Sequence, residues 1–180
     1  MTNANHVASG ERRVDVFFYG LFMDAELLRM QGFDPREPRL ARVDDMALRL
    51  GSRATLVPAR GAVVHGMLMR LTHAEIDRPY AEPSVAAYRA EPVVAASKDG
   101  GTVAALCFNL PEAPADGTSN PAYAAKLVVV ARRLGLPDAY IESIKCLILR
   151  SDSQGRVSKD GLQTRCSFPS LETALRASSG

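Results

Sequence analysis

The hydrophobic pattern predicts a strand near the N-terminus that ends in a sharp turn. Residues 14–19 form a run of β-branched and aromatic side chains, and Gly20 follows directly. Such a run is typical of a buried strand, and a glycine permits a tight turn at its carboxyl end. Asp24 can then cap a short helix for which Gly32 is a suitable left-handed stop.

Alternating hydrophobic and polar positions predict several further strands. Strands are expected over 41–50, 54–57 and 62–71, broken at Gly51 and by a Pro-Ala-Arg-Gly turn over 58–61. Two more, over 88–95 and 102–110, have the spacing of a hairpin around the sequence Lys-Asp-Gly-Gly.

The remaining pattern predicts helices on either side of this second hairpin. Thr72 and Glu75 have capping-box spacing, so a brief helix should run to Pro79, which leaves Glu82 in an irregular connection. Asn120 and Pro121 begin a helix with one apolar stripe, and another helix follows Pro137. Strands that cluster between helices favour an α+β fold over alternating βαβ units.

The chain divides into one domain and two flanks. Residues 1–13 lack periodicity and are expected to form a flexible leader, residues 14–150 the domain, and residues 151–180 a peripheral C-terminal tail. A chain of 180 residues with 47% hydrophobic and 23% charged residues can bury its own core.

Charge and cysteine content narrow the possible partners. The net charge is only +2 and the basic residues are scattered, which argues against a nucleic-acid partner. The three cysteines lie far apart and never in a C-x-x-C pair, so a reducing cytoplasm is the expected location. No apolar run approaches the ~18 residues of a membrane span. The three histidines lack ligand spacing, so no metal site is expected.

Three segments carry a resemblance to a known family. They are Tyr19-Gly20-Leu21 at the end of the first strand, Asp77 to Glu82 before Tyr88-Arg89, and Tyr123 early in the closing helix. On these residues the chain resembles the γ-glutamylcyclotransferases over roughly residues 14–148.

Several positions depart from the family pattern. Leu21 and Phe22 stand where the family usually has a hydroxyl residue and then Asn or Leu, Pro83 where Gly often follows the Glu, and Phe108 where some members have Tyr. These changes affect the expected substrate more than the expected fold.

The resemblance implies a bent mixed β-sheet or small β-barrel flanked by helices. It implies a cofactor-free reaction in which the α-amine of a small γ-glutamyl compound attacks the γ-carbonyl and 5-oxoproline is released. The α-amine has a pKa of ~7.7 to 8.0 and needs a proton acceptor, for which Glu82 is the candidate as general acid and base. The loop Tyr19-Gly20-Leu21 is expected to cradle the substrate and the oxyanion, with Phe22 and Tyr123 also contacting the substrate.

Other readings of the same residues stay open. Glu82 could be a solvated loop carboxylate, and Tyr19 and Tyr123 could be core aromatic residues. The chain could be a catalytically silent binding module of the same fold, a reading that Leu21 and Phe22 favour. A weaker alternative is a lyase of γ-glutamyl amines, whose apolar leaving group would suit an apolar loop. The sequence also leaves a homodimer open.

Overall fold

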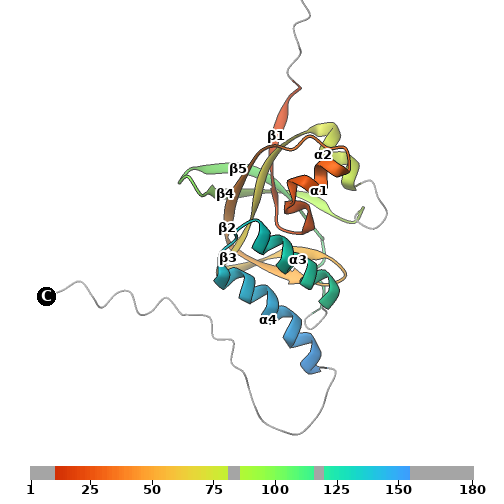
Figure 1. Ribbon diagram of the computed structural model, residues 1–180, viewed down its shortest axis with the longest axis vertical. Coiled ribbons are helices and arrows are strands. Elements are labelled where there is room, and N and C mark those ends of the chain that lie inside the picture. Colours follow the sequence, from red (N-terminus) through yellow and green to blue (C-terminus); the bar gives the residue numbers. More distant parts are fainter. Residues whose placement is uncertain (1–10, 81–85, 116–119, 155–180) are drawn as a thin grey trace, which may run out of the picture.

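The computed structural model describes residues 11–80, 86–115 and 120–154 (Figure 1). Glu82 lies outside the described residues, as do residues 1–10 of the expected leader and 155–180 of the expected tail. The last described helix runs to Gln154, four residues beyond the boundary expected at 150.

Five strands close into a barrel in the order β1-β3-β2-β4-β5. Neighbouring strands pair antiparallel, except that β1 and β5 pair in parallel where Val16 lies opposite Leu106. The small barrel flanked by helices confirms the α+β expectation. The strands are β1 (Arg13–Phe18), β2 (Arg36–Leu50), β3 (Ala54–Thr72), β4 (Arg89–Ser97) and β5 (Thr102–Asn109).

The expected turn over 58–61 is wrong, because β3 continues through it. Asp44 pairs with Val63 and Met46 with Pro58, so residues 59–62 lie opposite Asp45 alone and form a bulge. Asp45 has a φ of 59° and Gly61 a φ of 77°, and the Gly61 N–H donates to the Asp45 carboxylate at 2.7 Å. The Pro-Gly signal therefore marks an irregularity inside a long hairpin, whose actual turn lies at 51–53.

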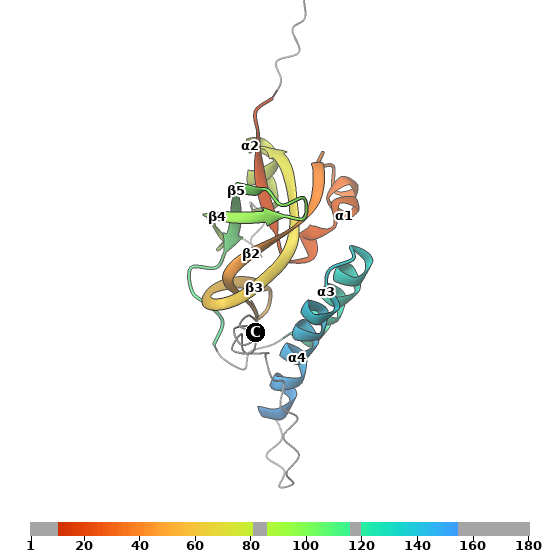
Figure 2. The ribbon, with the colours of Figure 1, turned by 90° about the vertical axis from the view of Figure 1, so that its left-hand side faces the viewer.

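The helices lie in two groups around the barrel. Helices α3 and α4 lie side by side at one end, and α1 and α2 lie at the other (Figures 1 and 2). Among the described helices, none combines the length and apolar character needed to cross a bilayer. The elements are the 3-10 turn η1 (Leu21–Met23), α1 (Ala25–Met30), α2 (His73–Tyr80), α3 (Pro121–Arg133) and α4 (Asp138–Gln154).

Local capping explains where α1 and α3 begin. The Asp24 carboxylate accepts the Glu26 N–H at 3.0 Å, and the Asn120 side chain accepts the Tyr123 N–H at 3.0 Å, with Pro121 as the first helical residue. Both caps satisfy backbone donors that a helix start leaves unpaired. Leu127, among the fully buried residues of α3, anchors the helix in the core.

Glu75 joins the start of α2 to the entry of the first strand. Its carboxylate accepts the Thr72 N–H at 2.9 Å and the Asp34 N–H at 2.6 Å, and it pairs with the Arg13 guanidinium at 3.4 Å. Burial alone would raise the pKa of Glu75, but these donors outweigh it and hold the pKa below its usual 4.5. The expected capping box is confirmed, since the Glu75 N–H donates to Thr72 Oγ1 at 3.2 Å, although α2 ends at Tyr80 instead of Pro79.

We expect Glu75→Gln to destabilise the fold by about 1–3 kcal/mol at pH 7, because it removes a charged acceptor of several hydrogen bonds. A carboxyl whose pKa is depressed stabilises the fold above its unfolded value, and this contribution is lost as the pH falls through the folded pKa. The difference in the free energy of unfolding between the parent protein and the variant should therefore be smaller at pH 3 than at pH 7. Urea denaturation at both pH values, with the exposed Glu112→Gln as control, measures it. A difference in the free energy of unfolding that is the same at both pH values would contradict this account.

Candidate functional site

A pocket of about 480 Å³ opens where β1 ends, within the usual range of small-molecule sites. Its wall comes from the end of β1, from η1 and α1, from the start of β3, and from α2 and α3. Most of its lining residues have aromatic or aliphatic side chains, and polar atoms contribute about as much of the exposed lining as apolar ones. Its aromatic members other than Tyr88 and Tyr123 are Phe17, Phe18, Tyr19, Phe22, Phe33 and Phe108.

The structure brings all five predicted substrate residues to this one pocket. Tyr19, Gly20, Leu21 and Phe22 arrive from the end of β1, and Tyr123 arrives from the first turn of α3. Residues from opposite halves of the sequence therefore share one wall. Their part in substrate binding stays a prediction.

Glu82 cannot be placed against this pocket, because it lies outside the described residues. The residues on either side of that segment do reach the pocket. Arg78 contributes to the wall from α2, and Tyr88 contributes from just before β4. The catalytic role expected of Glu82 stays a prediction.

Tyr19 contributes its ring to the pocket wall and turns its hydroxyl toward β5. Only 6% of the residue is exposed, and its hydroxyl lies 2.8 Å from Asn109 Oδ1 and also within hydrogen-bonding reach of the Phe108 carbonyl. Both partners are acceptors, so the single hydroxyl proton is directed at β5. This geometry fixes the strand end in place.

Gly20 leaves room for the Tyr123 hydroxyl. A Cβ atom at position 20 would lie 2.7 Å from Tyr123 Oη, closer than such atoms come in folded proteins. The backbone of Gly20 has a φ of −105°, which any residue adopts, so space and not conformation requires the glycine. The Leu21 N–H donates to the same Tyr123 oxygen at 3.4 Å.

Tyr88 and Tyr123 form the polar end of the pocket together with Arg53. Burial raises the pKa of Tyr88 to about 12, with a further contribution from Tyr123 and an opposing one from Arg53. Burial also raises the pKa of Tyr123. Its hydrogen bonds with the Leu21 N–H and the Ala54 main chain and the positive charge of Arg53 lower this pKa, but by less than burial raises it. Both hydroxyls are therefore protonated at neutral pH. The Tyr88 hydroxyl donates to the Ala54 carbonyl.

Arg78 lies at the side of the pocket formed by α1 and α2. Its guanidinium carbon lies 4.1 Å from the centre of the Phe33 ring, and its Nη2 donates to the Gln31 carbonyl at 3.0 Å. Arg78 is exposed, and this cation–π contact and hydrogen bond hold its guanidinium group beside the wall.

Sequence reasoning did not assign Arg53, Arg78 or Tyr88 to the site. Arg53 lies in the hairpin turn between β2 and β3, which sequence showed only as a break in strand periodicity. Tyr88 and Arg78 flank the Glu82 segment, and their closeness to that candidate was the available signal.

The described wall holds no carboxylate or imidazole. Nor do three or more His, Cys, Asp or Glu side chains gather as metal ligands would anywhere in residues 11–80, 86–115 and 120–154. The described part of the pocket can therefore bind, orient and donate hydrogen bonds. A proton acceptor would have to come from a residue outside it.

No protein-family model and no curated protein matches the chain. Several solved structures do match it in fold. A γ-glutamyl cyclotransferase matches with a TM-score of 0.60 at 18% identity, over 74% of this chain and 87% of its own. YkqA from Bacillus subtilis matches with a TM-score of 0.64 at 21% identity, over 79% of this chain and 56% of its own.

A third solved structure is a γ-glutamyl cyclotransferase specific to glutathione from yeast. It matches with a TM-score of 0.56 at 11% identity, over 78% of this chain and 96% of its own. Identities this low establish the fold alone. The chain adopts the γ-glutamyl cyclotransferase-like fold, as the sequence resemblance predicted.

Proposed function

We propose that this protein cyclises a small γ-glutamyl compound and releases 5-oxoproline. One observation carries the proposal: on a γ-glutamyl cyclotransferase-like fold, the five residues that the sequence singled out for substrate binding line a single pocket. Tyr123 in α3 lies more than a hundred residues beyond the loop at the end of β1 that it meets in this pocket.

The proposed reaction replaces one carbon–nitrogen bond with another and moves one proton between the two nitrogen atoms. The α-amine nitrogen attacks the γ-carbonyl carbon, and the bond from that carbon to the leaving nitrogen breaks. One proton leaves the attacking amine, and one reaches the leaving amine. The attacker and its target belong to one molecule, so the protein mainly folds the substrate and moves a proton.

Glu82 is our proposed proton carrier. The proposal rests on its sequence position between Arg78 and Tyr88, which both line the pocket, and on the lack of a carboxylate in the described wall. A cytoplasmic location belongs to the same proposal and rests on the cysteine pattern.

The oxyanion of the intermediate would be stabilised near Leu21. The Leu21 N–H already points at an oxygen atom, that of Tyr123, over a long 3.4 Å contact. A developing oxyanion beside this pair could receive hydrogen bonds from the Leu21 N–H and from the Tyr123 hydroxyl. The neutral state of Tyr123 keeps its proton available for donation.

A second candidate is a binding module of the same fold without turnover. The apolar side chains of Leu21 and Phe22 in the pocket wall favour it, because they replace polar groups that the resemblance leads one to expect. A panel of γ-glutamyl dipeptides and amines, assayed for 5-oxoproline, decides between the two functions.

We expect Glu82→Gln to lower the rate of 5-oxoproline release ~10²-fold or more, because glutamine keeps the shape of the side chain but cannot accept the proton. Affinity for a γ-glutamyl dipeptide, measured by calorimetry, should change little. Glu112→Gln, at an exposed position outside the pocket wall, is the matched control. Unchanged release in Glu82→Gln would remove Glu82 from the mechanism.

We expect Gly20→Ala to displace the Tyr123 hydroxyl, since the new methyl group would lie 2.7 Å from it. The variant should lose stability by about 1–3 kcal/mol and lose most of its turnover. The double variant Gly20→Ala/Tyr123→Phe should recover stability, because the clashing oxygen is gone, but not turnover. Thermal denaturation and 5-oxoproline release check both parts. Full activity in Gly20→Ala would show that the Tyr123 hydroxyl takes no part.

A further inference from the structure

We propose that a second cavity, between the barrel and the connection from α3 to α4, binds a small monocarboxylate with an apolar chain, and that Arg42 and Lys98 hold the carboxylate. The cavity has a volume of about 560 Å³, within the usual range of small-molecule sites. No described residue lines both this cavity and the pocket at the end of β1. The inference therefore does not rest on the proposed function.

Four segments that are far apart in the sequence meet around this second cavity. Strand β2 contributes residues 40–42, β3 contributes His65, the end of β4 and the following turn contribute residues 96–98 and Gly100, and the α3–α4 connection contributes residues 135–137. Pairing of β2 with β4 holds two of these segments side by side. The walls thus belong to the regular elements of the fold and to the short connections between them.

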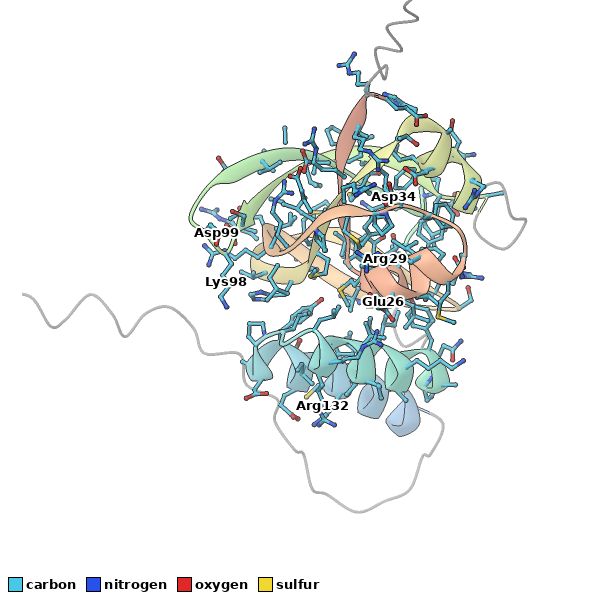
Figure 3. The ribbon with its side chains drawn as sticks, turned by 45° about the horizontal axis from the view of Figure 1, so that its top comes forward. Glu26, Arg29, Asp34, Lys98, Asp99 and Arg132 are labelled. Carbon is cyan, nitrogen blue, oxygen red and sulfur yellow. The ribbon has the colours of Figure 1, made fainter. Side chains whose placement is uncertain are left out.

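Two cations line the cavity from different elements. Arg42 comes from β2 and Lys98 from the turn after β4, and Figure 3 shows Lys98 between the tip of the β4–β5 hairpin and one end of the helix layer. The Nε atom of Arg42 pairs with the Asp44 carboxylate at 3.2 Å, and its Nη atoms donate no hydrogen bond to a described residue. The Lys98 ammonium likewise has no ion-pair or hydrogen-bond partner within the described ranges. Both groups can therefore donate to a ligand.

The balance of charge favours a ligand with a single negative charge. Asp44 offsets Arg42 in part, and none of the described lining residues is acidic. Asp99 and Asp138 are sequence neighbours of lining residues but do not line the cavity. The remaining charge is close to that of one cation, which matches a monocarboxylate better than a phosphate dianion. A carboxylate is also the planar acceptor that fits the two Nη atoms of a guanidinium.

The rest of the cavity is mainly apolar. Leu40, Ala96 and Leu136 are among its lining residues, and apolar atoms contribute more of the exposed lining than polar atoms do. Leu40 and Ala96 are only partly buried, so apolar surface remains in contact with water there. Covering such surface with a hydrocarbon chain is worth roughly 25 cal/mol per Å² removed from water. An apolar chain beside the carboxylate would therefore add to the affinity.

His65 provides an uncharged hydrogen-bonding group in the same cavity. Burial lowers the pKa of His65, the charge of Arg42 lowers it further, and Asp44 opposes both. Its ring lies against that of Tyr140 from α4, with the ring centroids 5.2 Å apart, and Lys98 lines the cavity from the turn. The imidazole is therefore mainly neutral at pH 7.5. An anion bound beside it would favour the imidazolium and raise this pKa.

The two cations also have a purely structural interpretation that the test must separate. Arg42 could serve only to pair with Asp44 on the surface of β2, and Lys98 could be a solvated turn residue, since both are exposed. Structural residues would not affect the binding of any ligand. Residues that bind a carboxylate would affect only the ligands that carry one.

The experiment measures by calorimetry, at pH 7.5, the binding of octanoate, 1-octanol, acetate and octyl phosphate to the full chain. We expect octanoate to bind with a Kd on the order of 0.1–1 mM. Octanol, which lacks the charge, and acetate, which lacks the chain, should bind at least ~10-fold more weakly. Octyl phosphate should also bind more weakly.

Four results of this comparison would overturn the inference. They are no detectable binding of octanoate, equal binding of octanoate and octanol, equal binding of octanoate and acetate, and binding of octyl phosphate at least as tight as that of octanoate. The last result would show that the head group recognised is not a monocarboxylate.

Arg42→Met and Lys98→Met should each weaken octanoate binding about 10-fold or more, as expected for the loss of a charge-assisted hydrogen bond, and leave octanol binding unchanged. Arg29→Met is the matched control, because Arg29 is also an exposed arginine paired with an exposed carboxylate, Glu26, and lies by α1 away from Lys98 (Figure 3). The control should bind octanoate like the parent protein, and circular dichroism should show all three variants folded. If Arg42→Met or Lys98→Met binds octanoate as tightly as the parent, the inference fails.

Two further measurements distinguish this cavity from the pocket at the end of β1. Arg78→Met changes a cation that lines that pocket and should leave octanoate binding unchanged. The pKa of His65, followed by NMR of its ring protons and assigned with His65→Gln, should rise when octanoate is bound. Loss of octanoate binding in Arg78→Met, or an unchanged His65 pKa in the saturated protein, would place the ligand elsewhere and overturn the inference.

Discussion

The pocket depends on the buried side chain of Asn109 at the end of β5. Its amide oxygen lies 2.8 Å from the Tyr19 hydroxyl and accepts the Leu56 N–H at 3.2 Å, while its amide nitrogen donates to Glu91 at 2.7 Å. One side chain thus ties the ends of three strands together at a place that is 1% exposed. Buried polar groups of this kind specify a single arrangement, because each lost partner carries a desolvation cost.

Once β1 is fixed at Tyr19, the position of the following loop is determined by its contacts with α3. Arg133 pairs with Asp24 at one end of the loop, and the Tyr123 hydroxyl meets Gly20 and Leu21 at the other. Asp24 is also the cap of α1, so the loop, α1 and α3 share one set of contacts. This explains how a helix more than a hundred residues away along the chain can complete a site at the end of the first strand.

Local signals in the sequence were sufficient for the parts of the fold that local chemistry determines. The cap at Asn120, the capping box from Thr72 to Glu75 and the first strand depend on neighbouring residues, and each was predicted, the strand with its end at Tyr19 instead of Phe18. The site was predicted only where residues belonged to the recognised segments. Arg53 was not predicted as a pocket residue, because its place in the pocket depends on strand pairing, which no local pattern reveals.

The bulge in the hairpin of β2 and β3 links the length of a remote segment to the chemistry of the pocket. Arg53 and Ala54 belong to the part of the hairpin beyond the bulge, where residues 59–62 are accommodated opposite Asp45 and pairing resumes with Met46 opposite Pro58. Side chains alternate between the two faces of a strand, so the loss or gain of one residue in the bulge would exchange those faces. Relatives of this protein could thus acquire a different charge in the pocket through a change of length in the bulge, without substitution of any residue that lines the wall.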